Sequence, residues 1–153
     1  MLSCFCSSDF AANNLEWIIQ QRGRNNITDY SVKDSITDRP YQKMAIKAVC
    51  EHLNKMHRKG LLVMATGTGK TRVAISIVDV LMRNGWVKSV LFLADRISLV
   101  GPAHKNFVKL LPNTTTCVLN DNSSDRDLNA RIIFSTYQTM INCIDTDEKM
   151  FSV

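Results

Sequence analysis

At 153 residues, 45% of them hydrophobic and 22% charged, the chain has the size and composition of one globular domain with a substantial core. It has no apolar run near the roughly 18 residues that a membrane-spanning helix needs, and its start does not resemble a secretory signal, so neither feature is expected. The five cysteines are scattered and complete no zinc-ligand spacing, which predicts free thiols in the cytoplasm.

The net charge of +5 is unevenly distributed along the chain. Residues 39–112 carry thirteen Lys and Arg against three Asp and Glu, whereas residues 1–38 carry three against five and residues 113–153 carry three against six. A basic middle favours a surface that faces phosphates. Lysines on solvated helix faces explain the same excess, so charge alone leaves both interpretations open.

Residues 1–38 are predicted to form an N-terminal helix and linker. Asn14 is suited to cap a short helix over residues 15–21 that ends at Gly23. Residues 24–38 are polar and aperiodic, which is typical of a loop. The second predicted region, residues 39–153, contains every motif described below.

A long helix is predicted to begin at Arg39-Pro40, because proline is tolerated at the first helical position, and to end at Gly60. Apolar residues recur within it at helical spacing, which predicts one buried face. The members of this predicted face are Tyr41, Met44, Ala45, Ala48, His52, Leu53 and Met56.

From residue 61 onward the pattern is one of alternating strands and helices. Short apolar runs predict buried strands, and longer segments bounded by Gly or Pro predict helices. The strands are predicted at residues 61–64, 90–94, 116–119 and 131–135, and the helices at residues 71–84, 102–110 and 137–144. This alternation favours an α/β fold in three layers, a parallel sheet with helices on both faces.

Residues 64–71 read Met-Ala-Thr-Gly-Thr-Gly-Lys-Thr and connect a predicted strand to a predicted helix, the context of a phosphate-binding P-loop. Glycines let the backbone curl around phosphate oxygens, and the helix start directs its positive dipole end at the same anion. Lys70 is predicted to reach the β- and γ-phosphates of ATP and Thr71 to ligate Mg²⁺, which makes both catalytic. The other predicted nucleotide contacts of the loop are Thr66, Gly67, Thr68 and Gly69. A Gly/Thr-rich turn that merely ends a strand is the alternative.

A further nucleotide contact is predicted upstream of the loop. Met64 stands where the strict P-loop pattern has glycine, and motor ATPases of helicase superfamily 2 have a looser first position. The segment from Arg39 to Gln42, one helix before the loop, resembles the Q-motif of that superfamily, whose glutamine reads the adenine edge. A side-chain amide can pair with adenine N6 and N7 together. A simple helix start is the alternative for this segment.

Two strand ends carry polar residues that suit nucleic-acid contacts. Residues 90–99 resemble motif Ia of the same superfamily, in which Arg96 would face phosphate and Asp95 would orient it, although Gly101-Pro102 is expected to interrupt the helix that follows. Residues 132–140 resemble motif Ic, and the predicted contacts to a nucleic-acid backbone are Ser135, Thr136 and Gln138. A structural ion pair at Arg96 and a helix cap at Ser135 or Thr136 are the alternatives.

Together these segments resemble the R (motor) subunit of type I restriction enzymes, within the group that includes type III restriction subunits and the excision-repair helicase UvrB. The resemblance covers residues 39–153. It implies the first part of a RecA-like P-loop NTPase lobe, with ATP and Mg²⁺ as cofactors and ATP-driven translocation on double-stranded DNA. Modification and specificity subunits of a restriction complex are the implied protein partners, and no membrane is implied.

The acidic motif that holds Mg²⁺ and orients the attacking water in such motors is not recognised in the sequence. Asp147-Glu148 follows a segment that is too short for both a crossover and a strand, so the lobe is expected to be incomplete and hydrolysis to be slow. Two other function classes remain: a non-enzymatic nucleotide-binding or interaction module with a vestigial P-loop, and a small-molecule kinase. The kinase is disfavoured, because kinases usually have the P-loop near the chain start.

Overall fold

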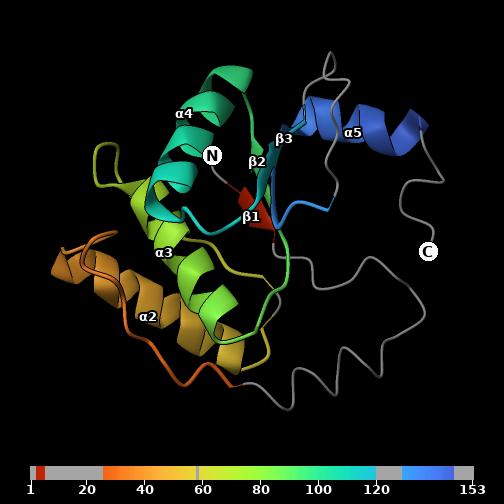
Figure 1. Ribbon diagram of the computed structural model, residues 1–153. Helices are drawn as coiled ribbons and strands as arrows, with labels where there is room; N and C mark the ends of the chain where they lie inside the picture. The colour runs from red at the N-terminus through yellow and green to blue at the C-terminus, as the bar shows by residue number, and fades with distance from the viewer. Residues whose placement is uncertain (1–2, 6–25, 58, 120–128, 147–153) are drawn as a thin grey trace. The chain divides into compact units, whose positions relative to one another are not determined.

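The computed structural model describes residues 3–5, 26–57, 59–119 and 129–146. The chain divides into two compact units, one formed by residues 19–87 and the other by residues 1–18 together with 88–153 (Figure 1). The helix predicted at residues 15–21 lies outside the described residues. Within the described part of the chain, no helix is long and apolar enough to cross a membrane.

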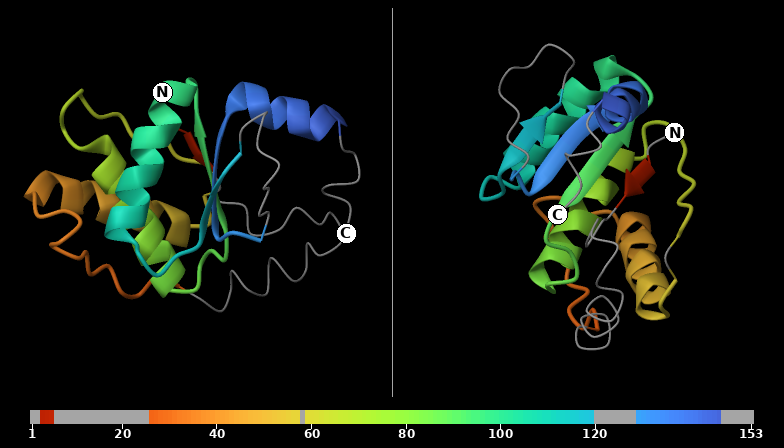
Figure 2. Two further views of the ribbon diagram at one scale, coloured as in Figure 1. Left: turned by 45° about the horizontal axis from the view of Figure 1, so that its top comes forward. Right: turned by 90° about the vertical axis from the view of Figure 1, so that its right-hand side faces the viewer.

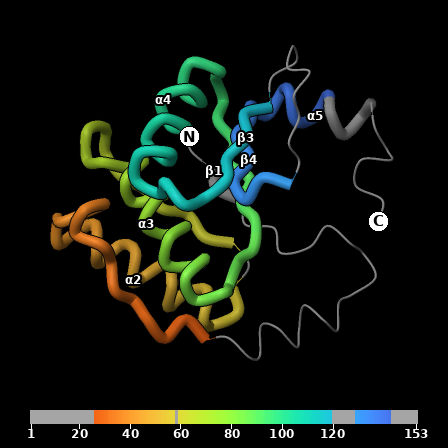
Figure 3. The backbone as a smooth tube through the Cα atoms, viewed as in Figure 1, coloured from red at the N-terminus to blue at the C-terminus, as the bar shows by residue number. Residues whose placement is uncertain are grey.

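The unit of residues 19–87 contains two helices that pack against each other, α2 (Pro40–Asn54) and α3 (Lys70–Arg83) (Figure 1). The segment before α2, residues 26–39, forms only a turn and confirms the predicted loop (Figure 3). α3 confirms the predicted helix to within one residue at each end, and Gly85 follows it with a φ of 67°. The fully buried side chains of this unit include Ile27, Ile36, Ile46, Ile75 and Val78.

The predicted buried face of α2 is wrong. The residues that the structure buries are Gln42, Ile46 and Cys50, whereas Tyr41 is 44% exposed and Met44 is 71% exposed. Two stripes with apolar residues run along this helix, and the one that contains Ile46 and Cys50 is buried. Burial raises the pKa of the Cys50 thiol to about 11, which keeps it protonated and unreactive.

The predicted end of α2 at Gly60 is also wrong, because the helix stops at Asn54. The Asn54 side chain bonds back to the N-terminal loop: its Oδ1 accepts from the Ile27 N–H at 2.9 Å, and its Nδ2 donates to the Tyr30 hydroxyl at 2.8 Å. Met56 then has a φ of 65°, in the left-handed region, which ends the helical path.

The strand predicted at residues 61–64 is absent from the sheet that the structure describes. Leu61, Leu62 and Val63 are 78%, 42% and 82% exposed, and none of the three has a backbone hydrogen bond to another described residue. An unbroken apolar run is typical of a strand whose two faces are both buried, and the side chains of this run are exposed instead. Here the run stays an unpaired connection that leads into the glycine-rich loop.

The other unit is built on a four-stranded sheet in the order β1-β2-β4-β3. Its strands are β1 (Ser3–Phe5), β2 (Val90–Ala94), β3 (Thr116–Val118) and β4 (Ile132–Thr136). β4 pairs in parallel with both β2 and β3, as the sequence predicts, and β1 adds an antiparallel edge that it does not predict. The register places Ala94 beside Thr136, so β2 and β4 end at the same edge.

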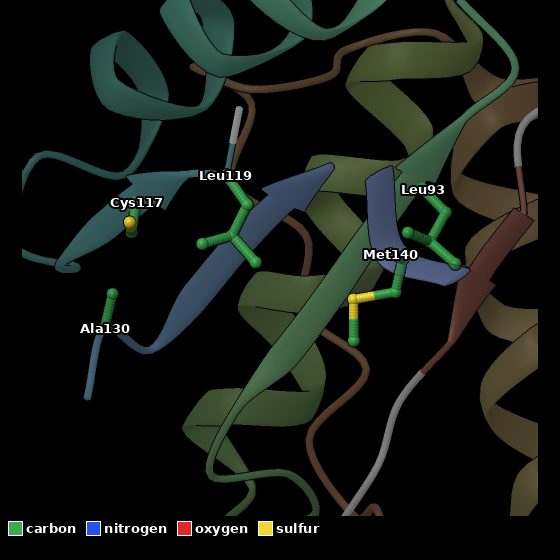
Figure 4. Packing of buried hydrophobic residues seen from close by; sticks show 5 residues of the cluster. All are labelled: Leu93, Cys117, Leu119, Ala130 and Met140. Carbon is green, nitrogen blue, oxygen red and sulfur yellow. The ribbon is translucent and has the colours of Figure 1, made fainter. Parts of the chain in front are cut away.

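Helices cover both faces of this sheet, which confirms the predicted α/β arrangement. α4 (Ile97–Leu110) and α5 (Tyr137–Thr146) lie on opposite sides of the strands (Figure 2). On the α4 side, Phe107 packs against Phe92 and Phe134 with ring centroids 5.6 and 5.1 Å apart. On the other side, a cluster (Figure 4) joins strand residues to the α5 residue Met140; its buried members are Leu93, Cys117, Leu119, Ala130 and Met140.

The helix predicted from Pro102 begins five residues earlier, at Ile97, so the expected interruption at Gly101-Pro102 does not occur. A proline six positions into a helix costs one backbone hydrogen bond, and the buried Val100, Ala103 and Phe107 offset that loss. α5 extends the predicted final helix by two residues to Thr146. Asp145 therefore lies on a helix, while Asp147 and Glu148 lie outside the described residues.

Candidate phosphate-binding site

The glycine-rich loop has the backbone of an anion-binding turn. Gly67 and Gly69 have φ angles of 78° and 84°, which L side chains rarely adopt. Two hydrogen bonds from Thr68 close the turn: its N–H and its hydroxyl both donate to the Ala65 carbonyl, at 3.4 and 2.6 Å. Successive N–H groups in such a turn point into one concavity, which suits phosphate oxygens.

The loop feeds directly into the N-terminus of α3. Gly69 is the N-cap residue and supplies no side-chain cap, so the first N–H groups of a 14-residue helix remain available to a ligand. No acidic residue lies in the first turn of α3 to neutralise its positive dipole end. Both facts favour an anion at this position.

The positively charged ammonium of Lys70 lies on the glycine-rich loop. It donates to the Ala65 carbonyl at 2.9 Å and to the Met64 carbonyl at 3.3 Å. These bonds fold the side chain back over the turn, where a phosphate chain would also lie. Thr71 follows at the start of α3 and is partly buried. In the described part of the chain, no group of three His, Cys, Asp or Glu side chains could hold a metal ion.

Gln42 lies against the loop and is only 2% exposed. Its Nε2 donates to the Thr68 carbonyl at 2.7 Å, and its Oε1 accepts from the Thr37 hydroxyl. The Tyr41 hydroxyl also donates to the Thr68 carbonyl, at 3.1 Å, and Arg39 Nη1 donates to the Tyr41 oxygen at 3.0 Å. The predicted Q-motif residues Tyr41 and Gln42 therefore contact the glycine-rich loop.

Gly69 is required by its surroundings as well as by its φ angle. A Cβ at this position would lie 2.5 Å from Gln42 Nε2, far inside van der Waals contact. A Cβ on Gly67 would meet no atom within 4 Å. The two glycines thus differ. Gly67 is needed only for its positive φ angle, whereas Gly69 is also needed because a Cβ would clash with the Gln42 amide.

The polar stripe of α3 binds the N-terminal loop. Asp79 is 6% exposed, and its two oxygens accept from Lys33 Nζ at 2.7 Å and from Arg83 Nε at 2.9 Å. Arg83 Nη1 continues to the Asp29 carboxylate at 2.7 Å. Hydrogen bonds from Ser31 and the charge of Arg83 lower the pKa of Asp29, which keeps this carboxylate ionised. These contacts fix the loop along the helix that starts at Lys70.

The predicted nucleic-acid residues all lie in the sheet unit, near the ends of β2 and β4. Arg96 is exposed and is the N-cap residue of α4; no ion pair joins it to Asp95 in the structure, which describes both. The Thr136 hydroxyl accepts from the Thr139 N–H at 3.2 Å and so caps the first turn of α5. Ser135 is fully buried, and its hydroxyl has no partner among the described residues. Gln138 is exposed.

Sequence reasoning missed Thr37, which bonds to Gln42 beside the glycine-rich loop, and the Lys33–Asp79 pair, which joins the N-terminal loop to α3. Thr37 lies in a polar stretch that shows no periodicity, and nothing in that stretch distinguishes a buried hydroxyl from an exposed one. The signal for Asp79 was present, because an acid in an otherwise apolar helix usually has a partner.

Comparison with known proteins identifies the family of this chain. The family model described as "Type III restriction enzyme, res subunit" matches residues 35–152. Over 61 residues the chain is 48% identical to the type I restriction enzyme EcoKI endonuclease subunit of Escherichia coli (strain K12), covering 40% of this chain and 5% of that protein. It is 28% identical over 109 residues to the type I restriction enzyme SauCOLORF180P endonuclease subunit of Staphylococcus aureus (strain COL), covering 69% of this chain and 12% of that protein.

A third relative, the type I restriction enzyme EcoAI endonuclease subunit of Escherichia coli, is 44% identical over 68 residues, which is 44% of this chain and 8% of that protein. The chain thus spans 5% to 12% of the length of these relatives. The parallel strands with helices on both faces and the family match confirm the predicted incomplete RecA-like α/β lobe. The chain belongs to the family of type III restriction enzyme res subunits, and its curated relatives are type I restriction endonuclease subunits.

Proposed function

We propose that this chain binds Mg·ATP at residues 65–71 and forms the nucleotide-binding part of an ATP-driven DNA translocase of a restriction system. One observation carries the proposal: two left-handed glycines deliver the backbone to the uncapped N-terminus of α3, with the Lys70 ammonium on the turn. This arrangement offers several N–H donors and one cation to a single phosphate chain.

Each member of the loop has a distinct task in the proposal. Lys70 exchanges its bonds to the Met64 and Ala65 carbonyls for the β- and γ-phosphates, and Thr71 offers its hydroxyl to Mg²⁺. Bound Mg²⁺ would neutralise part of the charge that develops on the phosphates. The backbone of Thr66, Gly67, Thr68 and Gly69 surrounds the phosphate chain.

Recognition of the base is assigned to Gln42, with Arg39 beside it. The amide makes one hydrogen bond to the loop and accepts one from Thr37, which leaves one N–H and one lone pair for adenine. Because the side chain is 2% exposed, a base contact requires the Gln42 side chain to become accessible on binding. Selectivity for ATP over GTP is therefore proposed to be modest.

The DNA-related part of the proposal rests on the relatives, whose names describe endonuclease subunits of type I restriction enzymes. Arg96 and Gln138 are exposed near the sheet edge where β2 and β4 end, and are proposed to face DNA phosphates. Ser135 and Thr136 are also proposed to contact the DNA backbone. Because Ser135 is buried and the Thr136 hydroxyl caps α5, these contacts require the end of β4 to rearrange. Modification and specificity subunits are the proposed partners, in the cytoplasm.

Calorimetric titration with Mg·ATP tests nucleotide binding. Lys70→Ala should weaken binding by at least ~1.5–3 kcal/mol, because a charged donor to phosphate is lost. Lys47→Ala is the matched control: Lys47 is an exposed lysine of the same unit whose ammonium lies 3.8 Å from Glu51, and its loss should leave affinity unchanged. Equal affinity of wild type and Lys70→Ala would refute the site.

Hydrolysis by the polypeptide alone is proposed to be slow, with or without DNA. Positioned water and a stabilising arginine supply most of the rate in phosphoryl transfer, and an arginine finger alone contributes about 10³–10⁵. A steady-state phosphate-release assay on wild type and Glu148→Gln decides the matter. Robust turnover that disappears in the variant would show that Glu148 belongs to the acidic motif and would refute the proposal of slow hydrolysis.

A further inference from the structure

Thr37 is a fully buried hydroxyl in a polar loop. It lies three residues before α2, and its Oγ1 donates to Gln42 Oε1. A buried hydroxyl that donates to a side chain holds that side chain in place. The acceptor here is the amide that touches the P-loop.

The Thr37 and Thr68 bonds together hold the Gln42 amide in one orientation. With Oε1 held by the Thr37 hydroxyl, Nε2 faces the Thr68 carbonyl and donates to it at 2.7 Å. The flipped amide would place Oε1 against that carbonyl oxygen, where two acceptors repel, whereas the Thr37 hydroxyl could turn to accept from Nε2. The Thr68 carbonyl therefore selects the orientation of the amide, and the Thr37 hydroxyl holds its other end. One orientation therefore satisfies both neighbours.

The Thr68 carbonyl in turn fixes the peptide that follows it. It accepts from Gln42 Nε2 and from the Tyr41 hydroxyl, at 2.7 and 3.1 Å. Because a trans peptide is planar, holding the Thr68 carbonyl toward α2 directs the Gly69 N–H to the opposite side. That N–H donates to no other described residue, and it precedes the free N–H groups of α3.

We propose that Thr37 is a positioning residue for phosphate binding: through the Gln42 amide and the Thr68 carbonyl it aims the Gly69 N–H at the phosphate chain. The relay spans the loop before α2 and the P-loop. The inference rests on the proposed nucleotide binding and adds to it a residue that never touches the ligand. It also separates two tasks of Gln42, holding the loop and reading the base.

Inorganic tripolyphosphate is the probe that distinguishes these tasks, because it has phosphates and no base. Calorimetry with Mg·tripolyphosphate and Mg·ATP should be run on wild type, Thr37→Val and Thr37→Ser. Thr37→Val keeps the shape and loses the hydroxyl, so affinity for both ligands should fall by the same factor, about fivefold to tenfold for one lost hydrogen bond. Thr37→Ser keeps the donor and should stay within about twofold of wild type.

Thr139→Val is the matched control. Thr139 is also a buried threonine in a side-chain hydrogen bond, to Thr136 at 3.0 Å, but it lies in the sheet unit. Its loss should leave tripolyphosphate affinity unchanged. Thermal unfolding of each variant shows whether it is folded. If Thr37→Val does not fold, Gln42→Leu breaks the relay at its next member and should weaken tripolyphosphate binding by a similar factor.

The outcomes separate the inference from the proposed function. A wild-type chain that binds neither ligand refutes nucleotide binding itself. Wild-type binding with an unchanged tripolyphosphate affinity in Thr37→Val, or in Gln42→Leu where that variant replaces it, overturns the inference and leaves the function standing. Weakened ATP binding with intact tripolyphosphate binding also overturns it, because Thr37 would then act on the base. Equal weakening that serine restores supports the relay.

Discussion

Alanine at Gly69 should destabilise the nucleotide-binding unit much more than alanine at Gly67. Both glycines have φ angles near 80°, so each substitution carries a similar backbone cost, about 1–2 kcal/mol for a non-glycine residue in the left-handed region. At Gly67 that cost is the whole effect, because the added Cβ meets no atom within 4 Å.

At Gly69 the added Cβ would lie 2.5 Å from Gln42 Nε2. A free glutamine would simply move, but this one is buried, donates to the Thr68 carbonyl and accepts from Thr37. Displacing its amide breaks both hydrogen bonds, which adds about 1–3 kcal/mol to the backbone cost. The expected loss of unfolding free energy is therefore about 2–5 kcal/mol at Gly69 and about 1–2 kcal/mol at Gly67.

Urea unfolding followed by tryptophan fluorescence measures the difference. The chain has two tryptophans, Trp17 and Trp86, so a Trp17→Phe background leaves Trp86, just after α3, as the reporter. Gly67→Ala is the control for backbone strain. Equal losses of unfolding free energy for the two alanine variants would refute the reasoning, because they would mean that the Gln42 side chain moves away from the new Cβ without destabilising the fold.

Three further predictions concern base choice, DNA and the α3 ion pairs. Gln42→Ala should abolish any preference for ATP over GTP, on the order of 1 kcal/mol per hydrogen bond, and a preference that survives in competition binding would count against adenine reading. Any DNA binding should be sequence-independent and steeply salt-dependent, and Arg96→Ala should reduce the salt slope by roughly one phosphate contact; tight binding that ignores salt would contradict this. Asp79→Asn should lower the unfolding free energy by about 2–3 kcal/mol, because it weakens a nearly buried carboxylate bonded to two cations, one of which is half exposed. Glu51→Gln, in an exposed pair with Lys47, should cost no more than about 0.5 kcal/mol in the same urea titration, and equal losses would show that burial of Asp79 adds nothing.

The elements that the sequence predicted well are those with strong local signals. Glycines bracket α3, and short apolar runs mark β2 and β4, so their bounds agree with the structure to within about one residue. The glycine-rich segment also has a strong local signal, and the positive φ angles of Gly67 and Gly69 agree with the expected curl of its backbone. The role of Lys70 and Thr71 in nucleotide binding stays a prediction.

The elements that the sequence predicted poorly depend on distant contacts. α2 has two apolar stripes, and only the packing against α3 decides that Ile46 rather than Met44 is buried. α4 begins before Pro102 because buried side chains outweigh one lost backbone bond. Thr37 could not be recognised, since its role depends on a glutamine five residues away and a carbonyl on another loop.

The exposed run from Leu61 to Val63 has a consequence for solubility. Three consecutive apolar side chains there are 78%, 42% and 82% exposed, on a backbone that pairs with no other described residue. Such a segment is a template for strand pairing between molecules, and concentrated protein should associate through it. Val63 is the most exposed of the three, so a charge introduced there should oppose association while leaving residues 65–71 of the glycine-rich loop unaltered.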